Sequence, residues 1–233
     1  FRYDCQKRSN FDSNLRILMP DGSRKTVDVR TLAITRFAEN ESHSEGLYSV
    51  AFAGTEGVGP DLNHPHFLHG LKLWQTHYAL RVQLPTMLVE NVQIDHAAYG
   101  VYRPRFENHV YRNISIAATG SEPFNRGLDD KSMQHGSITV DGLVFSKIGY
   151  GGNMPLIQIS ANNLSGKAES HFRKVTVRGR DPKRPGRWPL MNLGGGPRLK
   201  PSTPKGVPYF IHDYFGPGKH AKVISSRAKD LLA

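Results

Sequence analysis

The chain has 233 residues, of which 38% are hydrophobic, and its formal net charge is +11 at pH 7. This length allows one sizeable hydrophobic core, and no run of about 18 apolar residues suggests a transmembrane helix. The single cysteine, Cys5, excludes an internal disulfide framework. Phe1-Arg-Tyr3 is already strand-like and no signal-like segment comes before it, so we expect Phe1 to lie inside a longer chain.

The positive charge is confined to the last third of the sequence. Residues 1–161 contain 16 basic and 16 acidic residues, whereas residues 162–233 contain 15 basic and 4 acidic residues. A basic segment on a neutral body can attract a polyanion, either an acidic polysaccharide or a nucleic acid. The alternative is a solvated tail that keeps one end of the chain soluble. Nucleic acid has no support beyond charge, because the sequence offers neither a recognition helix nor an aromatic platform for single strands.

Residues 1–65 form an irregular first part. Alternating apolar residues predict strands over 15–18, 25–29 and 32–34, and Pro20-Asp-Gly22 predicts a turn that makes the first two a hairpin. Gly46-Leu-Tyr48 matches Gly100-Val-Tyr102 later in the chain, which indicates that a repeat begins before residue 65.

From Phe67 onwards one short pattern recurs. Two aliphatic residues flank one polar residue at 71–73, 92–94 and 114–116, and the steps between their first members are 21 and 22 residues. A second column lies three positions earlier and follows the same steps, at Leu68, Val89 and Tyr111. This period is too long for a strand hairpin and too short for a βαβ unit. It fits one coil of a right-handed parallel β-helix, a solenoid whose coils stack and bury a shared core.

The same two columns continue further along the chain with longer steps. The pattern returns at 143–145 and 175–177. The step from one repeat to the next lengthens equally in both columns, first to 29 and then to 32 residues. We therefore expect two inserted loops, containing residues 122–131 and 160–166, on one functional face of the solenoid. The prediction is an all-β chain with β-helix coils over 1–180 and a basic, irregular extension over 181–233 that caps the last coil.

Three phrases resemble a known family: residues 40–47 (Asn-Glu-Ser-His-Ser-Glu-Gly-Leu), 73–78 (Leu-Trp-Gln-Thr-His-Tyr) and 99–103 (Tyr-Gly-Val-Tyr-Arg). With its repeats, the chain resembles the bacterial branch of the pectin-lyase-like parallel β-helix superfamily. Within it, the chain is similar to the family that includes the cell-migration-inducing hyaluronan-binding protein. The resemblance covers most of residues 1–180 and implies an extracellular or periplasmic location and recognition or depolymerisation of an acidic polysaccharide. It supplies no catalytic residues, because no catalytic motif is matched position by position.

Side chains that directly follow the repeated strands are candidates for a sugar-binding groove. Trp74 and Asp95 hold equivalent positions in neighbouring coils, and Gln75 and His96 hold the next. Coils stack about 4.8 Å apart, so we expect Trp74 to touch Asp95. The alternative is that these are ordinary solvated turn residues.

The first inserted loop contains the densest cluster of titratable residues. Asp129 and Asp130 are adjacent, with Arg126 and Lys131 beside them. Glycosidases divide acid and base roles between two carboxyl groups roughly 5 to 10 Å apart. The candidate catalytic residues are therefore Asp129, Asp130, Asp95 and His96. A salt-bridged loop anchor is the alternative, so the sequence leaves a lyase, a hydrolase and a pure binding protein open.

The candidate substrate-binding residues combine aromatic rings with cations, which stack on sugars or bind carboxylates. They are Trp74, Tyr99, Tyr102, Arg103, Arg105, Arg126 and Lys131. The 11 histidines follow no zinc spacing, so we predict no metal centre or cofactor, although loop carboxylates and carbonyls can hold calcium. We thus expect an extracellular module that binds or processes an acidic polysaccharide. The alternative is a non-catalytic structural repeat domain of a larger secreted protein; the oligomeric state stays open.

Overall fold

The described part of the chain is built almost entirely from β-strands. The computed structural model describes residues 1–4, 12–53, 60–61, 63–102, 108–120, 122–125, 137–148, 156–158, 169–179, 191–192, 208–213 and 216–224. In these residues there is no α-helix, and so no helix long and apolar enough to cross a membrane. The elements are β1 (Arg2–Asp4), β2 (Asn14–Leu18), β3 (Arg24–Asp28), the 3-10 turn η1 (Val29–Thr31), β4 (Phe37–Ala38), β5 (Glu41–His43), β6 (Tyr48–Ala53), β7 (His66–His69), β8 (Lys72–Val82), β9 (Met87–Tyr102), β10 (His109–Ala117), β11 (Glu122–Asn125), β12 (Ile138–Ser146), β13 (Ile157–Gln158), β14 (Ser170–Arg178), β15 (Met191–Asn192), β16 (Pro208–Ile211) and β17 (Ala221–Ile224).

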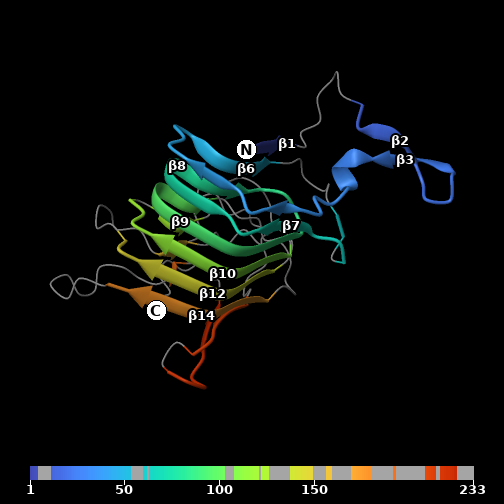
Figure 1. The fold of residues 1–233 in the computed structure, drawn as a ribbon. Coiled ribbons are helices and arrows are strands. Elements are labelled where there is room, and N and C mark those ends of the chain that lie inside the picture. Colours follow the sequence, from blue (N-terminus) through green and yellow to red (C-terminus); the bar gives the residue numbers. More distant parts are fainter. Residues whose placement is uncertain are drawn as a thin grey trace, which may run out of the picture.

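Most strands join one large, mainly parallel sheet, which confirms the all-β prediction. Its main path runs β1-β6-β8-β9-β10-β12-β14-β16-β17, and only the last pair is antiparallel (Figure 1). The long strand β9 pairs with β10 through its first part and with β11 through its last part. β11 continues to β13 and β15, so a second parallel ladder continues from the last part of β9. Neither described sheet closes on itself.

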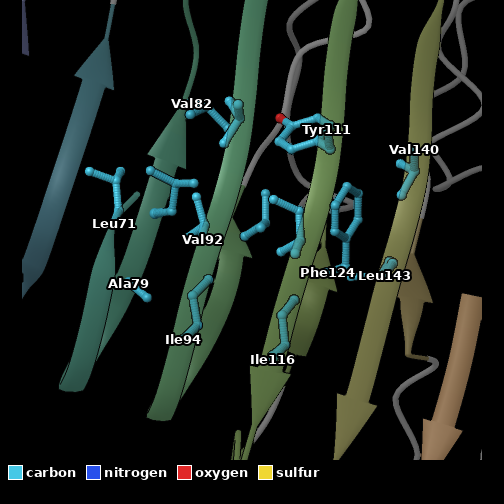
Figure 2. Close-up of a cluster of buried hydrophobic side chains, with 14 of the residues drawn as sticks. Leu71, Ala79, Val82, Val92, Ile94, Tyr111, Ile116, Phe124, Val140 and Leu143 are labelled. Atoms are coloured by element: carbon cyan, nitrogen blue, oxygen red, sulfur yellow. The ribbon is translucent and has the colours of Figure 1, made fainter. Parts of the chain in front are cut away.

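The predicted apolar columns pair residue by residue. Leu68, Val89 and Tyr111 are partners on neighbouring strands, and Val140 and Phe172 extend the same column. All five are fully buried. The second column behaves in the same way, and Figure 2 shows side chains of both columns pointing into one apolar interior with Phe124 from β11. The second column consists of Leu71, Val92, Ile114, Leu143 and the half-buried Val175.

Residues with positive φ bend each repeat at two fixed places. Within β9 these residues are Asn91 (φ 54°) and His96 (φ 50°), so one long strand divides into three short segments. Asparagine tolerates the left-handed region better than most residues. Asn113, at the position equivalent to Asn91, donates from Nδ2 to Asn91 Oδ1 at 3.1 Å. The same conformation recurs in the other repeats, at Gly70, Gly142 and Lys174 in the first position and at Gln75, Ala118, Lys147 and Gly179 in the second.

An outer column of alternating charge crosses the sheet beside the first bend. We define the charged column as Glu90, Arg112, Asp141 and Arg173, which are partners on β9, β10, β12 and β14. Glu39, His69 and Lys174 lie beside this column. His69 Nε2 lies 3.4 Å from Glu39 Oε1, and Arg112 Nη1 lies 2.7 Å from Glu90 Oε1. Lys174 Nζ lies 3.0 Å from Asp141 Oδ1. Opposite charges on neighbouring strands stabilise the pairing that brings them together.

Two histidines lie inside the protein instead of on its surface. His66 is fully buried and accepts a hydrogen bond at Nδ1 from the Ile34 amide at 3.0 Å, and burial lowers its pKa to about 4. His109 Nε2 lies 2.6 Å from the Leu84 carbonyl oxygen, so this nitrogen carries the proton. Its Nδ1 therefore accepts from the Tyr111 hydroxyl at 3.0 Å, and burial raises the pKa of that phenol.

The first part of the chain contains the predicted hairpin and one wrong prediction. β2 and β3 pair antiparallel, with Gly22 at φ 81° in the turn. Residues 32–34, expected as a strand, are irregular. Leu32 has an extended backbone, but the Ile34 amide donates to the His66 ring at 3.0 Å instead of to a neighbouring strand.

Candidate functional site

Six of the residues predicted from the sequence lie outside the described residues. They are the loop residues Asp129, Asp130, Arg126 and Lys131, and the pair Arg103 and Arg105. Four others lie on described parts of β8 and β9, on outward positions around the second bend: Trp74, Asp95, Tyr99 and Tyr102. His96 is the bend residue itself.

Trp74 and Asp95 are direct partners on β8 and β9, which is the adjacency expected from the repeat. Trp74 also stacks on His43 of β5, with ring centroids 4.6 Å apart and an angle of 15° between the rings. One face of the indole is therefore covered by a neighbouring ring. The strand pairing therefore places an aromatic ring beside the Asp95 carboxylate on the outer side of the sheet.

Asp95 and His96 form a contact that is open to water. Asp95 Oδ1 lies 3.0 Å from His96 Nδ1, and the side chains are 53% and 68% exposed. A pair with this exposure contributes little to stability, because water weakens its attraction. The general acid of a glycosidase owes its function to an apolar, water-poor pocket. The surroundings of Asp95 have no such character.

The most extensive aromatic cluster lies on the last segment of each repeat. We call Tyr48, Tyr78, Tyr99 and Tyr102 the tyrosine ladder. Tyr48, Tyr78 and Tyr99 are partners on β6, β8 and β9, and their ring centroids are 4.9 and 4.6 Å apart. Tyr102 lies against Tyr78 with 4.4 Å between centroids. All four rings are half-buried on the outer side of the sheet, while the alternate residues Leu80 and Val101 fill the core.

Arg81 adds a cation to one end of the tyrosine ladder. Its guanidinium carbon lies 5.2 Å from the centre of the Tyr48 ring, and Nη1 donates to the Tyr48 hydroxyl at 3.0 Å. Nε donates to Gln83 Oε1 at 2.8 Å. No described carboxylate forms an ion pair with Arg81. Among the described residues, its side-chain position is fixed by neutral partners.

The ladder brings together two predicted residues, Tyr99 and Tyr102, and three that the sequence reasoning missed: Tyr48, Tyr78 and Arg81. The step of 21 residues from Tyr78 to Tyr99 was the available signal. The match between Gly46-Leu-Tyr48 and Gly100-Val-Tyr102 is wrong in register, because Tyr48 is the partner of Tyr78. The pairing of Tyr48 with Tyr78 could not be read from the period, because 30 residues separate them instead of 21.

No group of three or more His, Cys, Asp or Glu side chains in the described ranges is arranged to hold a metal ion. Comparison of the chain with protein-family models, with curated protein sequences and with solved structures finds no match.

Proposed function

We propose that the protein is an extracellular or periplasmic module that binds an acidic polysaccharide at the tyrosine ladder and Arg81. We also propose that its fold is a right-handed parallel β-helix related to the pectin-lyase-like superfamily. Support for the fold comes from three strand segments per repeat, separated by positive-φ residues such as Asn91 and His96, and from apolar columns that continue through five strands.

The binding proposal rests on the way in which neutral side chains hold Arg81. Tyr48 and Gln83 hold the Arg81 guanidinium in a fixed orientation through hydrogen bonds. Neither partner is charged, so neither neutralises the guanidinium. Guanidinium groups bind carboxylates through two parallel hydrogen bonds, and the carboxylate is the charged group of uronic acids. The phenol hydroxyls and ring edges beside it suit the hydroxyl-rich surface of a sugar chain.

A structural role is the second candidate, and the tyrosine stacking favours it. Tyr78 lies between Tyr48 and Tyr99, so both of its ring faces are covered by neighbouring rings. Such stacking contributes about 0.5 to 1.5 kcal/mol per pair without any ligand. A sugar therefore meets the hydroxyls and edges of the middle rings, and a protein without ligand would still gain from the ladder.

Measuring the binding of the protein to hyaluronan, polygalacturonate and neutral dextran distinguishes the binding role from the structural role. We expect the wild-type protein to bind an acidic polymer and not dextran, and Arg81→Gln to weaken that binding about tenfold, or about 1.4 kcal/mol. Arg112→Gln is the matched control, because Arg112 lies in the charged column and pairs with Glu90. Equal weakening by both variants, or no binding to either acidic polymer, would reject the proposed site.

The same incubations report on catalysis. Unsaturated products that absorb in the ultraviolet would reveal a lyase, and new reducing ends without that absorbance would reveal a hydrolase. Binding without either product supports a pure binding module. If either product forms, separate variants of Asp95, His96, Asp129 and Asp130 identify which of these candidate residues take part.

A further inference from the structure

The last hairpin, β16–β17, is attached to the parallel sheet by a short ladder. Only three residue pairs join β14 to β16: Ser170 with Tyr209, His171 with Phe210, and Phe172 with Ile211. The amide of His212 adds one bond to the Phe172 carbonyl oxygen at 2.9 Å. By comparison, β12 and β14 are joined through seven residue pairs. Side-chain contacts therefore contribute a large share of what holds β16 in place.

Two histidines form the central contact of this attachment. His171 Nδ1 on β14 lies 3.0 Å from His212 Nε2 at the end of β16, and the rings are stacked with 5.3 Å between centroids. The His171 ring also stacks on Phe210, at 5.0 Å and 11°. The nitrogen contact requires one nitrogen to donate and the other to accept, so only one of the two carries a proton.

Protonation affects this contact in two steps. One imidazolium can still donate to a neutral partner, so a single added proton leaves the bond intact. A proton on both facing nitrogens removes the acceptor and places two cations in contact, which is repulsive. The hydrogen bond between His171 and His212 is thus lost when both rings are charged.

The neighbouring carboxylates offset only part of a second positive charge. On β14, Arg173 is one outward position from His171, and Glu169 Oε2 lies 3.8 Å from His171 Nε2. On the hairpin, the His220 ring lies 5.0 Å from the His212 ring, with Asp213 4.0 Å from His220. The other neighbouring strand, β12, contributes Asp141, which pairs with Lys174.

We propose that β16–β17 is a pH-dependent cap, held on β14 by the His171–His212 bond near neutral pH and released when both rings are protonated. Desolvation and the nearby Arg173 lower the pKa of both histidines below the ordinary 6.5. A released hairpin binds more protons than a docked one in the range below 6.5. Docking is therefore complete above that pH and weakens as the pH falls through the lowered pKa values.

Release changes the surface at the end of the sheet. Phe172 and Ile211 are almost fully buried while the hairpin is docked, and Val177 on the same strand is already 45% exposed. Without the hairpin, none of the described strands pairs with β14 on that side, and the end of an apolar column is uncovered. Such an edge can pair with another strand.

Hydrogen exchange measured by mass spectrometry on the intact chain tests the cap. Protection of residues 208–213 is compared with that of β10 in the same sample, at about pH 7.5 and about pH 5, so that the intrinsic pH dependence of exchange cancels. We expect relative protection of 208–213 to fall about tenfold or more in acid, while protection of β10 persists. Equal relative protection at both pH values would overturn the proposal.

Variants assign the effect to the histidine pair. His212→Gln and His171→Asn each place an amide near the lost nitrogen and cannot be protonated, so we expect either variant to abolish the pH response. His220→Gln is the matched control, since it removes a histidine of the same cluster and leaves the 3.0 Å contact in place. A pH response retained in both pair variants, or lost in His220→Gln alone, would show that the pair is not the switch.

Discussion

Glu90 is the partner of Arg112 on the neighbouring strand, and its two carboxylate oxygens face two different side chains. Its Oε1 lies 2.7 Å from Arg112 Nη1, and its Oε2 lies 3.8 Å from His69 Nδ1. The Glu90 side chain is only 20% exposed, so water weakens these contacts less than those of a free surface pair.

Replacing Glu90 by glutamine should therefore lower the free energy of unfolding by about 1 kcal/mol. The loss is measured by urea unfolding at low salt, and added salt should reduce the difference from wild type. Glu41→Gln is the matched control, because the Glu41–Lys72 pair has the same 2.7 Å distance but side chains 52% and 56% exposed. We expect that variant to lose less than half as much; an equal loss would mean that burial does not decide the effect.

Stability should also fall in acid because of His66. Its folded pKa is about 4, below the ordinary 6.5, so the unfolded chain binds more protons between these two values. The stabilisation is fully present above 6.5, declines as the pH falls towards 4, and amounts to about 3 kcal/mol over the window.

The variant His66→Asn checks this assignment, since the asparagine Oδ1 can accept the Ile34 amide and carries no titratable ring. The slope of unfolding free energy against pH should flatten between 4 and 6.5 in this variant. An unchanged slope in His66→Asn would assign the acid sensitivity elsewhere.

Gly100 is required where β9 and β11 approach each other. A Cβ atom at Gly100 would lie 2.2 Å from the backbone oxygen of Pro123, which only a shift of the strand can relieve. Gly100→Ala should lower the free energy of unfolding by about 1 to 3 kcal/mol, the usual cost of overpacking. Gly46→Ala, with no atom within 4 Å of the added Cβ, should be close to neutral in the same thermal unfolding experiment.

Tyr78 distinguishes a binding role of the tyrosine ladder from a structural one. Tyr78→Ala removes stacking on Tyr48 and Tyr99 and should destabilise the fold by about 1 to 3 kcal/mol. Tyr78→Phe keeps the ring, so we expect unchanged stability together with several-fold weaker binding of the acidic polymer. Tyr78→Phe that binds as well as wild type would leave the hydroxyl without a role in recognition.

The sequence predicted the register well because one physical signal repeats. Leu68, Val89 and Tyr111 recur at nearly constant steps since each must fill the same interior position, and this survives two longer steps. The strand at 32–34 was wrong because the Ile34 amide donates to the ring of the distant His66 instead of to a neighbouring strand. Arg81 was missed because its significance depends on Tyr48, which lies 33 residues away and outside the regular period. The proposed fold, family and polysaccharide remain predictions.

The charged column also bears on how faithfully the chain can fold. All repeats share one apolar pattern, so a strand that skipped its neighbour and joined the next one would still bury its aliphatic residues. The charged side chains disfavour such a misordered sheet. If β10 were omitted, Glu90 would lie beside Asp141, which has the same charge, whereas Arg112 separates them in the native sheet. Like charges directly opposite each other destabilise a strand pair. The alternating charges of the column thus specify the order of strands that are otherwise interchangeable. Reversing the charge at Arg112 should therefore produce misordered, aggregating chains more readily than it unfolds the native protein.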